Sequence, residues 1–184
     1  KIKTEVFISG TGSNLKNLIN FSKTKKSPIS IDLIISNTIK AKGLKFANQY
    51  QIKKKIFNFK NIKTTEKKLF ILLKKNKINF ICLAGFMKIL SSKFIKQFNG
   101  KIINIHPSLL PRYKGLNTHS RAIQNKDKFS GCTVHYVTEK LDSGKIIMQK
   151  KIKILKKDTP SSLARKILKQ EHKIYPKAIL KIFN

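Results

Sequence analysis

Thr4-Glu-Val-Phe-Ile-Ser-Gly-Thr-Gly-Ser-Asn-Leu15 is the stretch that decides the class of fold. The apolar run that ends at Ser9 predicts a buried strand, and the amphipathic pattern over residues 14–23 predicts a helix. Gly10 and Gly12 lie between them and allow the backbone to turn tightly. A strand that passes through a short turn into a helix is the repeating unit of parallel α/β folds.

The same alternation of strand and helix patterns continues along the rest of the chain. Short runs rich in Ile, Val and Phe alternate with longer amphipathic segments, as is typical of a mainly parallel sheet. We therefore expect an α/β fold in which residues 1–184 form a single doubly wound domain with helices on both faces of the sheet. The expected strands cover residues 4–9, 29–36, 55–57, 80–84, 101–104, 131–137 and 146–154, and the expected helices cover residues 14–23, 41–51, 65–76, 91–98, 119–124 and 160–182.

The composition favours a water-soluble protein with a full hydrophobic core. The chain has 184 residues, of which 40% are hydrophobic, and it contains no window of 18 uncharged apolar residues. We therefore expect a cytoplasmic protein that does not cross a membrane. Cys82 and Cys132 form no metal-binding pattern with each other or with the histidines. We interpret both as core thiols and expect no metal site.

The net charge of +33 at pH 7 raises nucleic acid as a class of partner. Only three of the 41 basic residues are arginines, however, and recognition of phosphates and bases favours the arginine fork. The lysines are also dispersed over five of the six expected helices. We therefore interpret them as a solvated surface and do not expect a nucleic-acid face, although their field can attract small anions.

The turn after the first expected strand is a candidate anion site. The backbone amides of Gly12, Ser13 and Asn14 would point at an anion at the start of a helix, where the helix dipole favours negative charge. Leu15 stands where the dinucleotide-binding fingerprint has its third glycine, and no P-loop lysine follows. A phosphate site and a plain strand-to-helix turn both fit this pattern.

A second candidate site follows the expected strand at 101–104. Asn104 and His106 alternate along the backbone, so their side chains should face the same side. A carboxamide that stabilises an oxyanion, beside an imidazole that transfers a proton near neutral pH, is suited to acyl transfer. A buried histidine bonded to backbone carbonyls is the alternative. Asp142 lies in an expected turn, where it could either hold the turn or reach His106.

Six ordered motifs resemble those of the formyltransferases that use 10-formyltetrahydrofolate, and most closely of those that act on glycinamide ribonucleotide. They are Ile8-Ser-Gly-Thr-Gly-Ser-Asn-Leu15, Leu83-Ala-Gly-Phe-Met-Lys-Ile-Leu90, Asn104-Ile-His-Pro-Ser-Leu-Leu-Pro111, Gly115-Leu-Asn-Thr-His119, Val134-His-Tyr-Val-Thr138 with Leu141-Asp-Ser-Gly144, and Gln170-Glu-His-Lys-Ile-Tyr-Pro176. The resemblance implies transfer of the formyl group of 10-formyltetrahydrofolate, as co-substrate, to the amine of glycinamide ribonucleotide in de novo purine (IMP) biosynthesis. It also implies a monomer or a weak homodimer.

The resemblance assigns roles to individual residues. Asn104 and His106 would stabilise the tetrahedral oxyanion, His106 would donate a proton, and Asp142 would support His106. The implied ribonucleotide-binding residues are Gly12, Ser13, Asn14, Leu15, Lys16 and Glu171. The implied folate-binding residues are Met87, Lys88, Ile89, Leu90, Asn104, Thr138, Glu139, Lys140, Leu141 and Asp142. Lys88, Asn117 and Leu168 depart from the family pattern, which more often has arginine, histidine and a polar residue there.

Three other functions compete with this interpretation. Methionyl-tRNA formyltransferase shares the His-Pro-Ser-Leu-Leu-Pro-Arg motif, but we expect it to have a further carboxyl-terminal domain for its tRNA. Formyltetrahydrofolate deformylase normally has His-His-Ser in place of His106-Pro107-Ser108 and an added amino-terminal domain. A non-enzymatic nucleic-acid-binding protein would carry basic residues on one face with aromatic residues between them, whereas the phenylalanines here follow apolar stripes.

Overall fold

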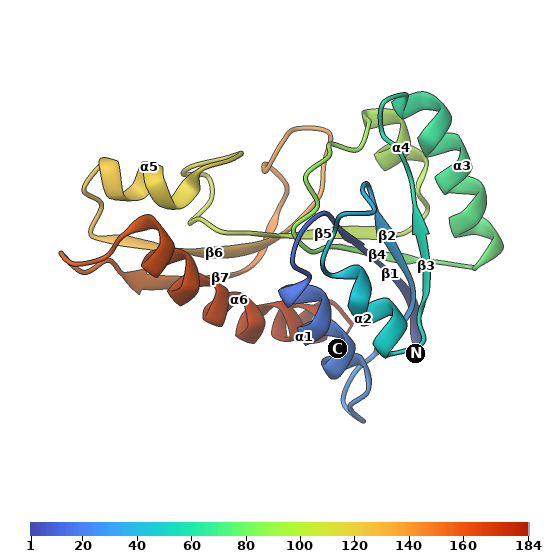
Figure 1. Cartoon of the computed structure of the whole chain (residues 1–184), viewed down its shortest axis with the longest axis horizontal. Coiled ribbons are helices and arrows are strands. Elements are labelled where there is room, and N and C mark those ends of the chain that lie inside the picture. The colour runs from blue at the N-terminus through green and yellow to red at the C-terminus, as the bar shows by residue number, and fades with distance from the viewer. Residues whose placement is uncertain (184) are drawn as a thin grey trace. The chain divides into compact units, whose positions relative to one another are not determined.

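The computed structural model describes residues 1–183, which form seven strands and six helices (Figure 1). The strands are β1 (Ile2–Ile8), β2 (Ile29–Ser36), β3 (Lys53–Ile56), β4 (Phe80–Leu83), β5 (Lys101–His106), β6 (Phe129–Tyr136) and β7 (Ile146–Lys153). The helices are α1 (Ser13–Ser22), α2 (Leu44–Gln49), α3 (Ile62–Lys75), α4 (Ser92–Gln97), α5 (Thr118–Gln124) and α6 (Pro160–Phe183). Every expected strand and helix is present, and its ends differ from the expected ones by three residues or fewer.

The chain divides into two compact units, Lys1–Ile103 and Asn104–Asn184. The strand order in the first unit is β3-β2-β1-β4, followed by the start of β5, and the pairs β2–β3, β1–β2 and β1–β4 are parallel. In the second unit the end of β5 is followed by β6 and β7, which pair antiparallel. The expected α/β class with a mainly parallel sheet is therefore confirmed. That residues 1–184 form one domain stays a prediction.

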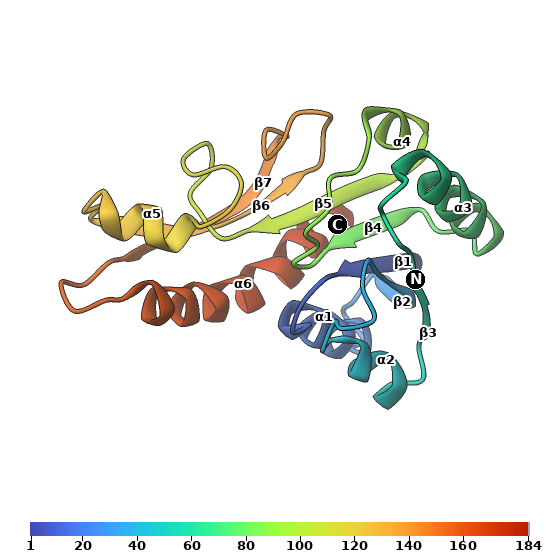
Figure 2. The same cartoon turned by 45° about the horizontal axis from the view of Figure 1, so that its top comes forward.

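Helices cover both faces of the strands in the first unit. Helices α1 and α2 lie on one side of the strands, and α3 and α4 lie on the other (Figure 2). A right-handed crossover explains this arrangement, because the chain first moves outward from β1 to β3 and then returns to place β4 on the other side of β1. Consequently β1 and β4 are buried on both faces, and Val6, Phe7 and Ile81 have no exposed surface.

Helix α6 contacts β6 and β7 in the second unit, and α5 contacts α6. Cys132 in β6 is buried, as is Cys82 in β4, and neither forms a disulfide. Burial, aided by the negative charge of Glu171, raises the pKa of the Cys132 thiol to about 12. The interpretation of both cysteines as core thiols is confirmed.

Lysines occupy the edge strand β3, whose four residues are all exposed, and also the exposed positions Lys150, Lys151 and Lys153 of β7. Charged side chains on an edge strand oppose pairing with another chain. Part of the positive charge therefore has a structural role in keeping sheet edges unpaired. None of the helices within residues 1–183 has the length and apolar character needed to span a bilayer.

Glu5 is a fully buried carboxyl group in the middle of β1, and neither of its side-chain oxygens has a hydrogen-bond partner. Burial raises the pKa of Glu5 well above its ordinary value, because the low-dielectric core disfavours the charged form. The folded protein therefore holds a proton on Glu5 at a pH where the unfolded chain has released it. Glu5 thus lowers stability progressively as the pH rises above the unfolded pKa.

We predict that Glu5→Gln raises the melting temperature relative to the parent protein by an amount that grows as the pH rises above 4.5, the ordinary pKa of a glutamic acid side chain. The amide has no proton to release, so the pH-dependent penalty disappears. Thermal unfolding followed by circular dichroism at several pH values measures this difference. Glu139→Gln, which changes a solvent-exposed carboxyl, serves as the control. A constant difference across the pH range would show that Glu5 is not the protonated group.

Candidate active site

The three residues expected to be catalytic come together in the second unit. Asn104 and His106 lie at the end of β5, and Asp142 lies in the turn between β6 and β7. The His106 Nδ1 and Asp142 Oδ2 atoms are 3.5 Å apart, and both side chains are buried. Sequence spacing could not establish this proximity, and the fold provides it.

Both ring nitrogens of His106 face an acceptor. Nδ1 faces the Asp142 carboxylate, and Nε2 lies 2.8 Å from the backbone carbonyl of Tyr113, to which it donates. A ring protonated on both nitrogens can therefore donate in two directions. The ring is bonded to a backbone carbonyl, as the alternative interpretation of His106 expects, and it also lies beside a carboxylate.

His135 belongs to the same cluster, although the sequence did not single it out. It lies at the end of β6 with 2% of its surface exposed, and its Nδ1 is 2.9 Å from the carbonyl of Tyr136. Its Nε2 is 3.4 Å from Asn104 Nδ2 and 3.7 Å from Asp142 Oδ1. The available signal was a histidine within the Val134 to Thr138 motif, near the end of a largely buried strand.

Burial is the main cause that lowers the pKa of His135, and the charge of His106 lowers it further. The Tyr136 carbonyl and the Asp142 carboxylate oppose this change without cancelling it. His119 at the start of α5 also has a lowered pKa, because of its burial and the charge of His106, and its Nδ1 is buried without a hydrogen-bond partner. The imidazoles of His135 and His119 are therefore both neutral near pH 7.

Side chains of β6 and β7 hold the first part of the proline-rich loop after β5. Thr133 Oγ1 donates to the Ser108 carbonyl at 2.7 Å and accepts from the Leu110 amide at 3.2 Å. Gln149 Nε2 donates to the Leu110 carbonyl at 2.8 Å and to Thr133 Oγ1 at 2.9 Å. These bonds give hydrogen-bond partners to backbone groups of the loop, which can form neither a helix nor a strand.

Tyr113 and Asp127 hold the next part of the loop. The Tyr113 hydroxyl donates to Asp127 Oδ2 at 2.7 Å and accepts from Asn125 Nδ2 at 2.8 Å. Arg112 Nη2 donates to Asp127 Oδ1 at 2.9 Å, and Arg121 Nη1 donates to the Lys114 carbonyl at 2.7 Å. Two of the three arginines thus have structural roles, and the Tyr113 carbonyl is held against His106.

The Asp142 carboxylate is fixed by the backbone. Asp142 has a φ of +46°, and its Oδ2 accepts from the Gly115 amide at 2.8 Å. Gly115 itself has a φ of +77°, a conformation that glycine adopts without strain. Gly144 lies so close to the Tyr136 carbonyl that a Cβ atom there would be 1.8 Å from its oxygen. Glycines therefore allow the close approaches that place Asp142 and the Tyr136 carbonyl.

The other expected folate segment of this unit, Thr138 to Leu141, is exposed to solvent. Leu141 has half of its surface exposed, at 50%. Glu171, expected to bind the ribonucleotide, is buried in α6 with 7% of its surface exposed. No group of three or more His, Cys, Asp or Glu side chains in residues 1–183 is arranged to hold a metal ion.

The expected phosphate turn lies in the first unit, between β1 and α1. Gly12 has a φ of +76° and caps α1 without a side chain, and a Cβ atom on it would lie 2.5 Å from the Cα of Gly43. Lys16 is exposed, whereas the side chain of Leu15 is fully buried. Leu15 can therefore meet a ligand only through its backbone, because its side chain belongs to the core.

The expected folate segment after β4 lies beside this turn in the same unit. The Met87 amide donates to Ser9 Oγ at 2.8 Å, and the Ser9 amide donates to the Gly85 carbonyl at 3.2 Å. Met87 and Ile89 are 63% and 65% exposed, Lys88 is also exposed, and Leu90 is buried. The chain places β2 and β4 on opposite sides of β1 in the sheet order. Ligands of open α/β sheets bind outside the carboxyl ends of the strands at such a point.

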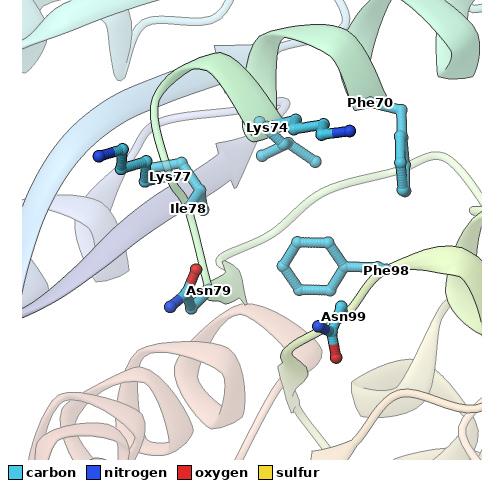
Figure 3. Close-up of a pocket in the computed structure, with 8 residues that line it drawn as sticks. Phe70, Lys74, Lys77, Ile78, Asn79, Phe98 and Asn99 are labelled. Atoms are coloured by element: carbon cyan, nitrogen blue, oxygen red, sulfur yellow. The ribbon is translucent and has the colours of Figure 1, made fainter.

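The first unit also contains a groove of about 390 Å³ beside the amino end of β4 (Figure 3). Ile78 and Asn79, which directly precede β4, line it together with Phe70 and Lys74 of α3 and Phe98 after α4. The glycine turn and Met87 instead follow the carboxyl ends of β1 and β4. None of the residues expected in the site lines this groove.

The family model described as formyl transferase matches residues 2–179. The chain belongs to the formyl transferase family. It is 42% identical to phosphoribosylglycinamide formyltransferase of Haemophilus influenzae over 180 residues, which covers 96% of this chain and 85% of that relative. It is 41% identical to the human trifunctional purine biosynthetic protein adenosine-3, covering 97% of this chain but only 18% of the length of the human protein.

Solved structures of this formyl transferase family have the same fold. A crystal structure of phosphoribosylglycinamide formyltransferase from Brucella melitensis superimposes with a TM-score of 0.93 at 40% identity, covering 99% of this chain and 95% of that one. The corresponding enzyme from Anaplasma phagocytophilum gives a TM-score of 0.91 at 42% identity, covering 97% and 85%. The family resemblance seen in the sequence motifs is confirmed.

We predict that Gly144→Ala lowers the melting temperature by about 5 °C or more, because a methyl group would overlap the Tyr136 carbonyl. Gly10→Ala is the matched control, since no atom lies within 4 Å of a Cβ built at Gly10. The control should melt within about 2 °C of the parent protein. Differential scanning calorimetry compares the three proteins. Equal melting of the two variants would mean that the turn relaxes and that Gly144 is not required.

Proposed function

We propose that this chain transfers the formyl group of 10-formyltetrahydrofolate to the amine of glycinamide ribonucleotide, a step of de novo purine biosynthesis. The convergence of Asn104, His106 and Asp142 in a formyl transferase carries the proposal. The names of the bacterial relatives support the choice of acceptor, and those relatives are matched over most of their length.

In this mechanism the substrate amine attacks the formyl carbon and an oxyanion develops on the formyl oxygen. An N–H group of Asn104 and the protonated ring of His106 stabilise this oxyanion. The bond to the folate nitrogen then breaks, and that nitrogen takes a proton from His106 while the attacking amine loses one to water. The nearby Asp142 carboxylate compensates the charge of the imidazolium.

His106 must exchange a hydrogen bond to act on substrate. Its Nε2 donates to the Tyr113 carbonyl in this structure. Catalytic hydrogen bonds in unliganded enzymes often form only when the substrate is bound. Substrate would therefore replace the Tyr113 carbonyl as the partner of Nε2, while Nδ1 keeps facing Asp142.

The backbone amides of Gly12 to Lys16 would bind the ribonucleotide phosphate at the start of α1, where the helix dipole favours an anion. Glu171 would bind the ribose end of the same substrate. Met87 to Leu90 and Thr138 to Asp142 would bind the folate, with exposed apolar side chains such as Met87 and Leu141 against its rings.

The other functions are not favoured, because the bacterial relatives that are matched over most of their own length carry the name phosphoribosylglycinamide formyltransferase. A monomeric or weakly dimeric state and a cytoplasmic location stay predictions.

We predict that the purified protein formylates glycinamide ribonucleotide and leaves initiator methionyl-tRNA unmodified when each is mixed with 10-formyltetrahydrofolate. His106→Ala and Asp142→Ala should each lower kcat by about 100-fold or more while leaving the fold intact, because proton transfer and its support are lost. Folate absorbance follows turnover, and circular dichroism checks the fold. Parent-like turnover in either variant would remove that residue from the mechanism.

A second prediction concerns the phosphate. Glycinamide riboside, which lacks the phosphate, should show a kcat/KM lower than that of the ribonucleotide by about 100-fold, because charge-assisted bonds to backbone amides are lost. The comparison uses one enzyme and two substrates, so folding is not a variable. Equal kcat/KM values for the two substrates would exclude a phosphate site.

A further inference from the structure

Asn104 can stabilise the oxyanion as proposed only if its amide nitrogen, and not its amide oxygen, faces the substrate. A carboxamide has an oxygen that only accepts and a nitrogen that only donates, and the two ends have nearly the same shape. Rotation of the amide by half a turn would present oxygen to the developing oxyanion and repel it. Some neighbouring group must therefore distinguish the two ends.

The structure assigns this task to His135: we propose that His135 is a positioning residue whose Nε2 lone pair fixes the orientation of the Asn104 amide. This inference rests on the proposed function. The Asn104 Nδ2 atom lies 3.4 Å from His135 Nε2. The opposite orientation would set the amide oxygen against a ring nitrogen that also accepts.

The Tyr136 carbonyl determines which nitrogen of His135 carries the proton. The carbonyl can only accept, and it lies 2.9 Å from Nδ1, so Nδ1 carries the hydrogen. In a neutral ring Nε2 is then the acceptor. The ring is neutral near pH 7 because burial lowers the pKa of His135 despite the nearby Asp142 carboxylate, and the charge of His106 acts in the same direction as burial.

Local backbone geometry directs this ring. The pairing of β6 with β7 shifts register between Val134 and His135, and such bulges re-aim the side chains beside them. Gly144 lies against the Tyr136 carbonyl, which its missing side chain permits. The Asp142 Oδ1 atom, 3.7 Å from Nε2, adds negative charge beside the nitrogen and further favours the NH₂ end of Asn104. One N–H of Asn104 thus faces His135, and the other is available for substrate.

Two substitutions separate this role from a purely structural one. The amide of His135→Asn reaches the position of Nδ1 and can still donate to Tyr136, but it offers no acceptor to Asn104. The amide of His135→Gln reaches the position of Nε2, so its oxygen can accept from Asn104, but it loses the bond to Tyr136. Each variant removes one of the two bonds, and only the first removes the one that orients Asn104.

The test is a double-mutant cycle on glycinamide ribonucleotide formylation. We expect His135→Asn to lower kcat by about tenfold or more with KM within about twofold, since an oxyanion donor is misplaced and ground-state binding is not. His135→Gln should recover most of kcat. In an Asn104→Ala background, His135→Asn should change kcat by less than about twofold, because it acts through Asn104.

Three results would overturn the inference. They are equal kcat losses in the Asn and Gln variants, a change in KM instead of kcat, and the same kcat loss with and without Asn104. If the parent protein fails to formylate glycinamide ribonucleotide, the proposed function fails, and that outcome is separate from the cycle. Circular dichroism melting of each variant verifies that all compared proteins are folded at the assay temperature.

Discussion

The Asp142 carboxylate is the group on which the candidate site depends. Its Oδ2 accepts from the Gly115 amide at 2.8 Å and lies 3.5 Å from His106 Nδ1, while its Oδ1 lies 3.7 Å from His135 Nε2. The carboxylate is buried, so its charge acts at short range with little screening by water. One side chain thereby joins a strand end, a loop and a second strand of the same unit.

A buried charge of this kind is stable only when its surroundings are arranged for it. The backbone amide of Gly115 and the imidazole of His106 supply that arrangement, and the loop that carries Gly115 is held by Thr133, Gln149 and Asp127 through their side chains. Changes at these anchoring residues should therefore reach the site, although none of them touches a reacting atom.

Hydrophobic periodicity predicted the fold well, because strands buried on both faces read as apolar runs and surface helices read as amphipathic segments. The elements around Val6, Ile34 and Leu69 are examples, and all three side chains are buried. The polar members of the site were harder to predict. Asn104 and His106 share one strand end and could be paired by alternation, but Asp142, His135 and His119 reach them from other elements.

By itself, the sequence determined the α/β class, the ends of the strands and helices to within a few residues, the core cysteines and the family motifs. These features depend on local backbone preference and on periodicity, which are properties of neighbouring residues. Only the tertiary structure decided that Asp142 faces His106 and that His135 faces Asn104. Those contacts join residues that are distant in sequence, and no local pattern specifies which distant group a side chain will meet after the strands pair.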